Sequence, residues 1–279
     1  MVPSDSLRLD SRHLSEVLPL SKAGTRALLD AVALHPQVKV WERGRREEEV
    51  QAARREVHFF DDESNYEKGV EWYRQQMPRS VEGEIVMEKT PAYFTSPLVP
   101  KRVHQLNPGM KMILIVREPV SRAVSDFTQV YYNREETNKS LPVFRNLAFT
   151  NHSTLDINYK PVRNSLYAVH LRRWLAFFPL HQFLILDGDL FAKDPLSQLR
   201  LVESFLGLSP SISPTQLVFN PSKGFHCFRR SLSSSPRCLG RSKGRPHVSI
   251  GPSSSLALRR LLRPHNQRFF HLINRIFPW

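Results

Sequence analysis

The chain has 279 residues, of which 41% are hydrophobic and 24% are charged, proportions that are ordinary for a globular protein with a buried core. Its 40 Lys and Arg residues outnumber its 26 Asp and Glu residues and leave a formal net charge of +14. This excess favours a polyanionic partner, which is a nucleic acid, an anionic membrane surface or an acidic polysaccharide. The length suits one domain, or two.

The sequence contains no apolar run that is long enough to span a bilayer. Residues 1–20 also lack the apolar centre of a signal peptide. We therefore expect the chain as given to be soluble, although the same pattern fits a fragment or a gene model that lacks its leader.

Predicted strands and helices alternate along the chain, beginning with the stretch LPLSKAGTRALLDAVALHPQV at 18–38. This stretch starts apolar, passes through a small-residue loop and continues with a helical period over 25–34. The later strands are predicted at 84–90, 111–116 and 183–189, and the later helices at 119–132, 164–178 and 195–207. Such alternation predicts the α/β class, with a central parallel sheet flanked by helices on both faces.

Three segments depart from this alternation. Residues 41–56 are dense in mixed charge and predict an exposed helix with pairs such as Arg45–Glu49. Residues 228–255 are rich in Ser, Pro, Arg and Gly, which predicts a loop-rich segment. The C-terminal residues 256–279 are basic and amphipathic, and we predict a helix packed on the sheet in preference to one that lies on a membrane.

The small-residue loop at 22–26 has the features of a phosphate site. A helix N-terminus offers free N–H groups and the positive end of a dipole, and here Lys22 adds a charge and Thr25 a hydroxyl. The pattern is not that of a nucleoside-triphosphate P-loop, because the Lys precedes Gly24. Taken alone, the stretch fits a capped helix without a ligand more often than a phosphate site.

A second candidate phosphate site follows the predicted strand at 111–116. Arg117 lies at the carboxyl end of that strand, where ligands of open α/β sheets gather. Ser125 follows within the next helix, and Gln129 lies one turn further on the same face. Arg117 and Ser125 can hold a phosphate together; the alternative is an Arg packed over the sheet edge and a solvated Ser.

The chain has only two cysteines, Cys227 and Cys238, so a zinc site made of cysteines is not expected. They are either two reduced thiols or a disulfide formed in an oxidising compartment. Two glycosylation sequons, at Asn138 and Asn151, favour the second alternative, although such tripeptides are common by chance.

Six motifs in order along the chain resemble those of one family: SKAGTRALL, EVHFFD, MEKTPAYFTSP, IVREPVSRAVSDFTQ, KGFHC and CLGRSKGRPH. The family is the heparan sulfate glucosaminyl 3-O-sulfotransferases, and EVHFFD with EKTPAYFTSP is most similar to its type 1 branch. The resemblance implies an N-terminal tail over 1–17 and a sulfotransferase domain over 18–279, with the P-loop-like fold of sulfotransferases that depend on 3′-phosphoadenosine 5′-phosphosulfate (PAPS).

The resemblance also implies where PAPS binds, with no metal ion required. Its 5′ end would lie on the loop residues Lys22, Ala23, Gly24, Thr25 and Arg26. Its 3′-phosphate would lie on Arg117 and Ser125. A segment that closes over the donor would consist of Lys243, Gly244, Arg245, Pro246 and His247.

The catalytic residues implied by the resemblance are Glu56 as general base, His58 and Asp61 as supporting and acceptor-binding groups, and Lys22. A sugar hydroxyl is a poor nucleophile until a carboxylate takes its proton, and Lys22 would stabilise the charge on the leaving phosphate oxygen. Glu56 and His58 are two residues apart in an apparent strand, so we expect them on one side.

The further acceptor contacts implied by the resemblance are Lys89, Gln129, Tyr159 and Lys160. The cysteines match the family's disulfide, Cys227–Cys238, and the family implies a location in the Golgi lumen. Its acceptor, heparan sulfate, is a polyanion that agrees with the net charge of +14.

Two departures from the family pattern keep alternatives open. Ala23 replaces a glycine, which would strain the loop if that position needs a positive φ. The family also has far fewer residues before the base, so 41–55 is a predicted insertion or a mispredicted exon.

The chain is therefore either an active enzyme or a catalytically impaired relative that binds heparan sulfate. A nucleic-acid-binding domain would explain the charge but not the motifs, and no membrane association is encoded in this chain.

Overall fold

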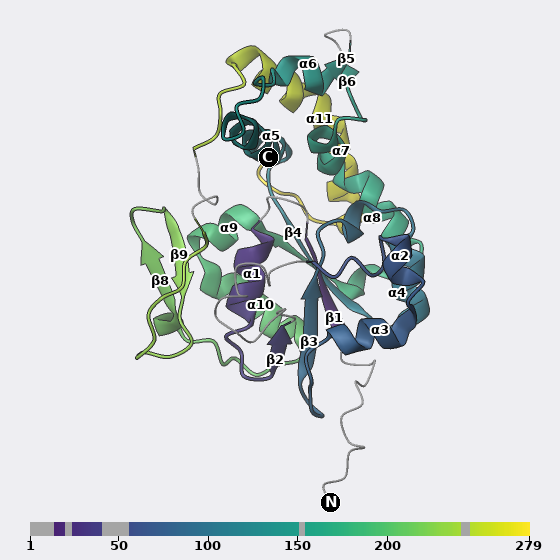
Figure 1. The fold of residues 1–279 in the computed structure, drawn as a ribbon, viewed down its shortest axis with the longest axis vertical. Coiled ribbons are helices and arrows are strands. Elements are labelled where there is room, and N and C mark those ends of the chain that lie inside the picture. The colour runs from purple at the N-terminus through teal and green to yellow at the C-terminus, as the bar shows by residue number, and fades with distance from the viewer. Residues whose placement is uncertain (1–13, 20–23, 41–55, 151–153, 241–245) are drawn as a thin grey trace, which may run out of the picture.

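The structure is a computed structural model that describes residues 14–19, 24–40, 56–150, 154–240 and 246–279. Five strands form the central sheet in the order β2-β3-β1-β4-β7 (Figure 1). In that order they cover Val38–Val40, Ile85–Lys89, Leu14–Pro19, Lys111–Val116 and Phe183–Asp187. Each pairing between neighbouring strands is parallel, which confirms the predicted α/β class.

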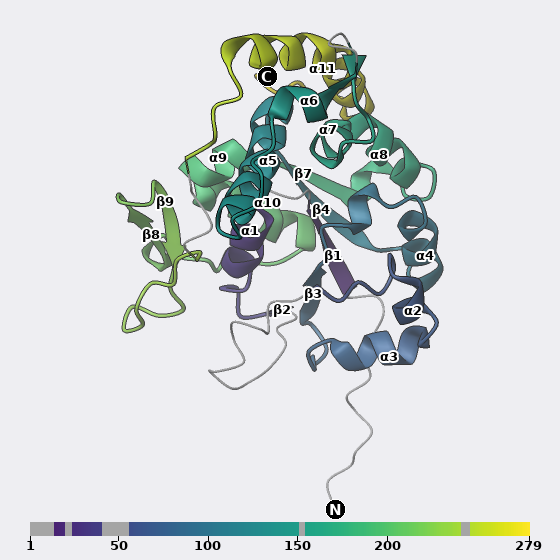
Figure 2. The same ribbon diagram turned by 45° about the horizontal axis from the view of Figure 1, so that its top comes forward.

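Helices cover both faces of this sheet, as Figures 1 and 2 show. One side carries α1 (Thr25–Val32), α9 (Gly188–Lys193) and α10 (Pro195–Leu206). The other side carries α2 (Glu63–Tyr66), α3 (Gly69–Gln76), α4 (Val99–Leu106) and α8 (Tyr167–Leu175). A further group lies beyond the carboxyl end of β4 and consists of α5 (Pro119–Glu135), α6 (Phe144–Ala148), α7 (Lys160–Ser165) and α11 (Pro252–Ile273).

Short elements connect these layers. Three 3-10 turns, η3, η4 and η5, cover Tyr93–Thr95, Leu180–Gln182 and Pro214–Gln216. Two antiparallel hairpins pair β5 with β6 and β8 with β9, and these strands cover Phe149–Thr150, Thr154–Leu155, Leu217–Asn220 and Phe225–Phe228. The β8–β9 hairpin projects from the side of the molecule that carries α1 and α10 (Figure 1).

The main core lies on the two faces of the sheet. Residues 112–116 of β4 are fully buried, because helices cover the strand from both sides. That burial is the reason for the continuous apolar run in this part of the sequence. A second apolar cluster joins α5, α7 and α11, with Val120, Val162 and Leu258 among its buried members.

The junction between β4 and α5 lies where the sequence predicts it. Pro119 is the first residue of α5, where its missing N–H is not needed. The carboxylate of Glu118 accepts hydrogen bonds from the backbone N–H groups of Val120, at 3.2 Å, and Ser121, at 2.7 Å. This cap ends the strand and leaves Arg117 directly at its carboxyl end.

Two predicted elements differ in extent from the observed ones. The strand predicted at 183–189 ends at Asp187, because the Asp187 side chain accepts a hydrogen bond from the backbone N–H of Asp189, at 2.8 Å, and caps α9. The helix predicted at 164–178 is divided between α7 and α8, because Leu166 has a ψ of 60° that interrupts the helical path.

The boundaries of two further predicted segments differ from those in the structure, and a third segment is not described. β1 begins at Leu14, within the segment 1–17 that was expected to be a tail. The predicted loop-rich segment 228–255 ends earlier than expected, because α11 begins at Pro252. The mixed-charge stretch 41–55 lies outside the described residues.

The C-terminal helix α11 is packed, as predicted, although on other helices instead of directly on the sheet. It lies against α5 and α8, and its residues Leu258, Leu262 and Phe269 are buried there. Beyond its end, Arg275 donates a hydrogen bond to the carbonyl of Ile185 in β7, at 2.9 Å. In the part of the chain that the structure describes, no helix has the length and apolar character needed to cross a membrane.

Cys227 and Cys238 form a disulfide bond, with their Cα atoms 4.4 Å apart. Cys227 belongs to β9 and is buried, and the bond ties β9 to the segment that pairs with it through Phe228 and Arg237. The disulfide implied by the resemblance is therefore confirmed in the structure.

Of the two glycosylation sequon residues, Asn138 is exposed and Asn151 lies outside the described residues.

Loss of this disulfide is expected to lower the free energy of unfolding by about 2–4 kcal/mol, because the bond closes a short loop and restricts the unfolded chain. Urea unfolding of the Cys227→Ser/Cys238→Ser double variant against wild type measures the difference. Non-reducing peptide mapping of secreted protein provides the check on pairing, and two free thiols there would contradict the prediction.

Candidate active site

The carboxyl ends of three neighbouring strands bring the predicted site residues to one edge of the sheet. Lys89 is the last residue of β3, Gly24 follows β1, and Arg117 follows β4. The strand order places β1 between β3 and β4. Gly24, the first described residue of the predicted donor loop, therefore follows the strand that lies between the one ending at Lys89 and the one followed by Arg117.

The donor loop is described from Gly24 onward, and Lys22 and Ala23 lie outside the described residues. Gly24 is the N-cap of α1 and has a φ of 91°, a left-handed conformation that favours glycine. Thr25 is buried at the start of the helix, and among the described residues no side chain caps the N-terminus of α1. Arg26 forms an ion pair with Asp30 at 3.0 Å.

On the other side of the donor loop, Arg117 forms an ion pair with the carboxylate of Asp189, at 2.7 Å, on α9. Ser125 and Gln129 lie half-buried on α5, and Gln129 donates a hydrogen bond to the side chain of Asn133. The sequence analysis did not predict Asp189, because its contact depends on α9 lying beside the end of β4.

The segment predicted to close over the donor is described only in part. Lys243, Gly244 and Arg245 lie outside the described residues, whereas Pro246 and His247 are exposed. The next residue, Val248, donates its backbone N–H to the hydroxyl of Thr128, at 3.0 Å. This bond holds Val248 against α5 at the residue before Gln129.

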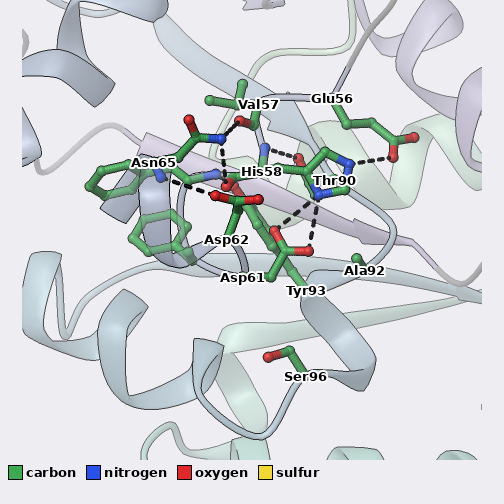
Figure 3. A network of polar contacts seen from close by, with 12 residues as sticks. Glu56, Val57, His58, Asp61, Asp62, Asn65, Thr90, Ala92, Tyr93 and Ser96 are labelled. Carbon is green, nitrogen blue, oxygen red and sulfur yellow. Dashed lines mark hydrogen bonds and ion pairs between the residues drawn. The ribbon is translucent and has the colours of Figure 1, made fainter. Parts of the chain in front are cut away.

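Glu56 is the centre of a charged cluster at the end of β3. One of its carboxylate oxygens accepts a hydrogen bond from Lys89 Nζ at 2.6 Å, and the other lies 3.3 Å from His58 Nε2. The other ring nitrogen of His58, Nδ1, lies 3.0 Å from the carboxylate of Asp61 (Figure 3). The structure thus brings together four of the predicted site residues.

The backbone of this cluster is not the strand that was expected. Residues 56–58 have no regular secondary structure, and His58 has a φ of 51°. Glu56 and His58 face one another because of this left-handed residue and not because of strand alternation.

The pKa of the Glu56 carboxyl is lower than its usual value. Burial raises it, but the hydrogen bonds and positive charges of His58 and Lys89 outweigh that effect. The carboxylate is consequently ionised at neutral pH, and the Glu56 side chain is still 28% exposed.

The pKa of His58 is raised from its usual value to about 10, chiefly by the hydrogen bond to Asp61 and then by the one to Glu56, while burial opposes the shift. The imidazole is therefore a cation at neutral pH. It supports the Glu56 carboxylate as a charge and hydrogen-bond donor, and it has no vacant nitrogen with which to act as a base.

Tyr159 and Lys160, two further predicted acceptor residues, are not bonded to this cluster. The Tyr159 side chain packs against Phe144, and its hydroxyl has no hydrogen-bond partner among the described residues. Burial raises the pKa of Tyr159 to about 12. Lys160 is exposed at the start of α7. Within the described ranges, no hydrogen bond or ion pair joins either residue to the Glu56 cluster.

Comparison with known proteins gives the family of the chain. Residues 17–254 match the family model of the sulfotransferase domain. Over 265 residues the chain is 43% identical to heparan sulfate glucosamine 3-O-sulfotransferase 5 of Homo sapiens, covering 94% of this chain and 72% of that protein. It is 40% identical to heparan sulfate glucosamine 3-O-sulfotransferase 6 of Homo sapiens, with the same coverage. The chain belongs to the heparan sulfate glucosamine 3-O-sulfotransferase family.

A solved sulfotransferase structure from Alicyclobacillus acidocaldarius has the same fold, with a TM-score of 0.63 at 19% identity over 95% of this chain and 96% of that one. The resemblance inferred from the motifs is confirmed at the level of the 3-O-sulfotransferase family. The likeness to its type 1 branch stays a prediction.

In this 3-O-sulfotransferase family member, three residues near the predicted base were not predicted from the sequence. Glu88, Thr90 and Tyr93 all belong to the motif MEKTPAYFTSP, of which only Lys89 was predicted as a site residue. Their side chains are buried and hydrogen-bonded near the turn that carries His58. A polar residue inside an otherwise apolar strand, as Glu88 is, was the available signal.

The raised pKa of His58 predicts a pH-dependent contribution to stability. The contacts of the His58 cation with Asp61 and Glu56 stabilise the folded protein fully below 6.5, the pKa of histidine in the unfolded chain. This contribution is lost as the pH rises toward about 10, the pKa of His58 in the folded protein. Because the side chain is 41% exposed, we expect the effect to be below about 1 kcal/mol. Urea unfolding of wild type and His58→Gln at pH 6 and above measures this contribution to the free energy of unfolding. A difference between the two proteins that grows with pH would contradict the raised pKa of His58.

Proposed function

We propose that this 3-O-sulfotransferase family member transfers a sulfuryl group from PAPS to the 3-OH of glucosamine residues in heparan sulfate, with Glu56 as the general base. One observation carries the proposal. The Glu56 carboxylate is held between two cations and remains partly exposed, at the same edge of the sheet as the donor loop. The named relatives are heparan sulfate glucosamine 3-O-sulfotransferases, which supports the choice of acceptor.

The described residues fit PAPS by their chemistry. The N-terminus of α1 has no side-chain cap from the described part of the chain, so its N–H groups suit the oxygens of the 5′-phosphosulfate. Arg117 and Ser125 follow β4 and suit the 3′-phosphate, as a guanidinium forms strong charge-assisted hydrogen bonds with phosphate. In the proposed complex, the 3′-phosphate would share Arg117 with Asp189 or replace it.

PAPS supplies the sulfuryl group when it is bound. Glu56 takes the proton of the acceptor 3-OH at a carboxylate oxygen, and Lys89 and His58 keep that carboxylate ionised beforehand. A carboxylate with a lowered pKa is a weak base, so we expect it to take the proton as the new oxygen–sulfur bond forms, when the hydroxyl has become acidic. Asp61 fixes the orientation of the His58 ring.

Heparan sulfate as acceptor also accounts for the formal charge of +14, because a dense polyanion is attracted to a strongly basic protein.

We further propose that the protein works in the Golgi lumen. The Cys227–Cys238 disulfide supports an oxidising compartment.

The test is transfer of radiolabelled sulfate from PAPS to heparan sulfate, followed by depolymerisation and identification of the 3-O-sulfated glucosamine. Labelled product at that position supports the proposal. Binding of heparan sulfate without transfer would instead favour the binding-module alternative. The rescue to try would then be Ala23→Gly together with deletion of residues 41–55.

A further inference from the structure

The turn that joins Glu56 to Asp61 has an unfavourable backbone conformation. His58 has a φ of 51°, in the left-handed region that residues other than glycine seldom adopt. Such a residue is unfavourable and persists only when its surroundings hold it in place. This conformation directs the His58 ring to Glu56 on one side and Asp61 on the other.

Two buried hydroxyls accept hydrogen bonds from consecutive backbone N–H groups of this turn. The N–H of Phe59 donates to Tyr93 Oη at 3.0 Å. The N–H of His58 donates to Thr90 Oγ1 at 3.5 Å, a long hydrogen bond (Figure 3). The Thr90 and Tyr93 side chains are almost entirely buried. The hydrogen bond from Phe59 is buried, so loss of the Tyr93 hydroxyl would leave that N–H without a partner.

Both hydroxyls share one further partner, the carboxyl of Glu88 on β3. The hydroxyl of Thr90 donates to Glu88 Oε2 at 3.1 Å, and the side chain of Tyr93 is also hydrogen-bonded to Glu88. Glu88 is 2% exposed, and burial raises its pKa to about 7 while these hydrogen bonds lower it. A hydroxyl that donates its proton to the Glu88 carboxyl, as that of Thr90 does, keeps its oxygen lone pairs for the backbone N–H group that it faces.

We propose that Glu88, acting through the hydroxyls of Thr90 and Tyr93, is a positioning residue that holds the turn in which Glu56 and His58 meet. This inference rests on the proposed role of Glu56 as the base. Glu88 does not touch the reacting groups; it orients two hydroxyls, which in turn fix the backbone at His58 and Phe59.

The experiment compares variants that remove a single hydroxyl with variants that keep it. Thr90→Val and Tyr93→Phe each remove one acceptor, and Thr90→Ser restores the hydroxyl. The matched control is Thr95→Val. Thr95 donates its hydroxyl to the carbonyl of Ala92, so this variant removes a nearby hydroxyl that is not bonded to the turn.

A third arm changes the shared partner itself. Glu88→Gln replaces one carboxylate oxygen with an amide donor, so only one oxygen is left to accept the hydroxyl protons. We expect its rate to lie between wild type and the hydroxyl-deleted variants.

Two readouts separate positioning from general stability. We expect kcat for sulfate transfer to fall about tenfold or more in Thr90→Val and Tyr93→Phe, with KM for PAPS unchanged, and to recover in Thr90→Ser. Histidine NMR titration should show the pKa of His58 falling toward 6.5 in the same variants, because the ring would lose its fixed contacts with Glu56 and Asp61.

The NMR titration does not depend on catalysis, so it distinguishes failure of this inference from failure of the proposed function. An inactive wild type whose His58 pKa still responds to Thr90→Val would overturn only the function. Wild-type kcat and an unchanged His58 pKa in both hydroxyl-deleted variants would overturn the inference. Equal loss in Thr90→Ser and Thr90→Val, or an equal loss in the control Thr95→Val, would also overturn it.

Discussion

Glu56→Gln is expected to reduce sulfate transfer by about 10²–10⁴-fold, the range typical for loss of a general base. The amide keeps the size and hydrogen-bonding capacity of the side chain but cannot take the proton of the acceptor hydroxyl. Affinities for heparan sulfate and for adenosine 3′,5′-bisphosphate should barely change. Transfer is measured at saturating PAPS, with binding of both ligands measured in parallel.

Glu63→Gln is the matched control for this prediction. It removes the same charge from a neighbouring carboxylate, which is 61% exposed and paired with Arg102. Its transfer rate should equal that of wild type. Transfer by Glu56→Gln within a few-fold of wild type would remove Glu56 from the mechanism, and an equal loss in Glu63→Gln would point to a general effect of charge.

Arg117→Ala is expected to weaken binding of adenosine 3′,5′-bisphosphate by about tenfold to one hundredfold. A hydrogen bond to a charged group contributes on the order of 1.5–3 kcal/mol, and every 1.4 kcal/mol corresponds to about a factor of ten in affinity. The substitution also leaves the Asp189 carboxylate without its guanidinium partner, next to the proposed 3′-phosphate. Calorimetric titration measures the affinity directly.

Asp189→Asn provides the control, because it keeps the positive charge of Arg117 and removes the carboxylate that competes with a phosphate. Binding in this variant should be as tight as in wild type or tighter. If Asp189→Asn weakens binding as much as Arg117→Ala does, the ion pair has a structural role and the 3′-phosphate site has been assigned wrongly.

Local sequence patterns were sufficient to predict the class of the fold and much of its layout. The apolar run at 111–116 predicts a strand buried on both faces, and it is one, because burial on both faces permits no polar alternation. Pro119 predicts the start of α5 for an equally local reason, since a helix does not need the N–H of its first residue. The ordered motifs were specific enough to predict the family and, with it, Glu56, His58, Asp61 and Lys89 as one site.

Only the tertiary structure decided how those residues meet. Glu56 and Lys89 are 33 positions apart and form their ion pair because the turn after Glu56 folds against the end of β3. A strand was expected at His58, and the observed left-handed residue depends on Thr90 and Tyr93, which no local pattern connects to it. The Arg117–Asp189 pair likewise requires α9 to lie beside β4. Periodicity and propensity act over one or two turns of chain, whereas a charged cluster depends on contacts between segments that only the packed core brings together.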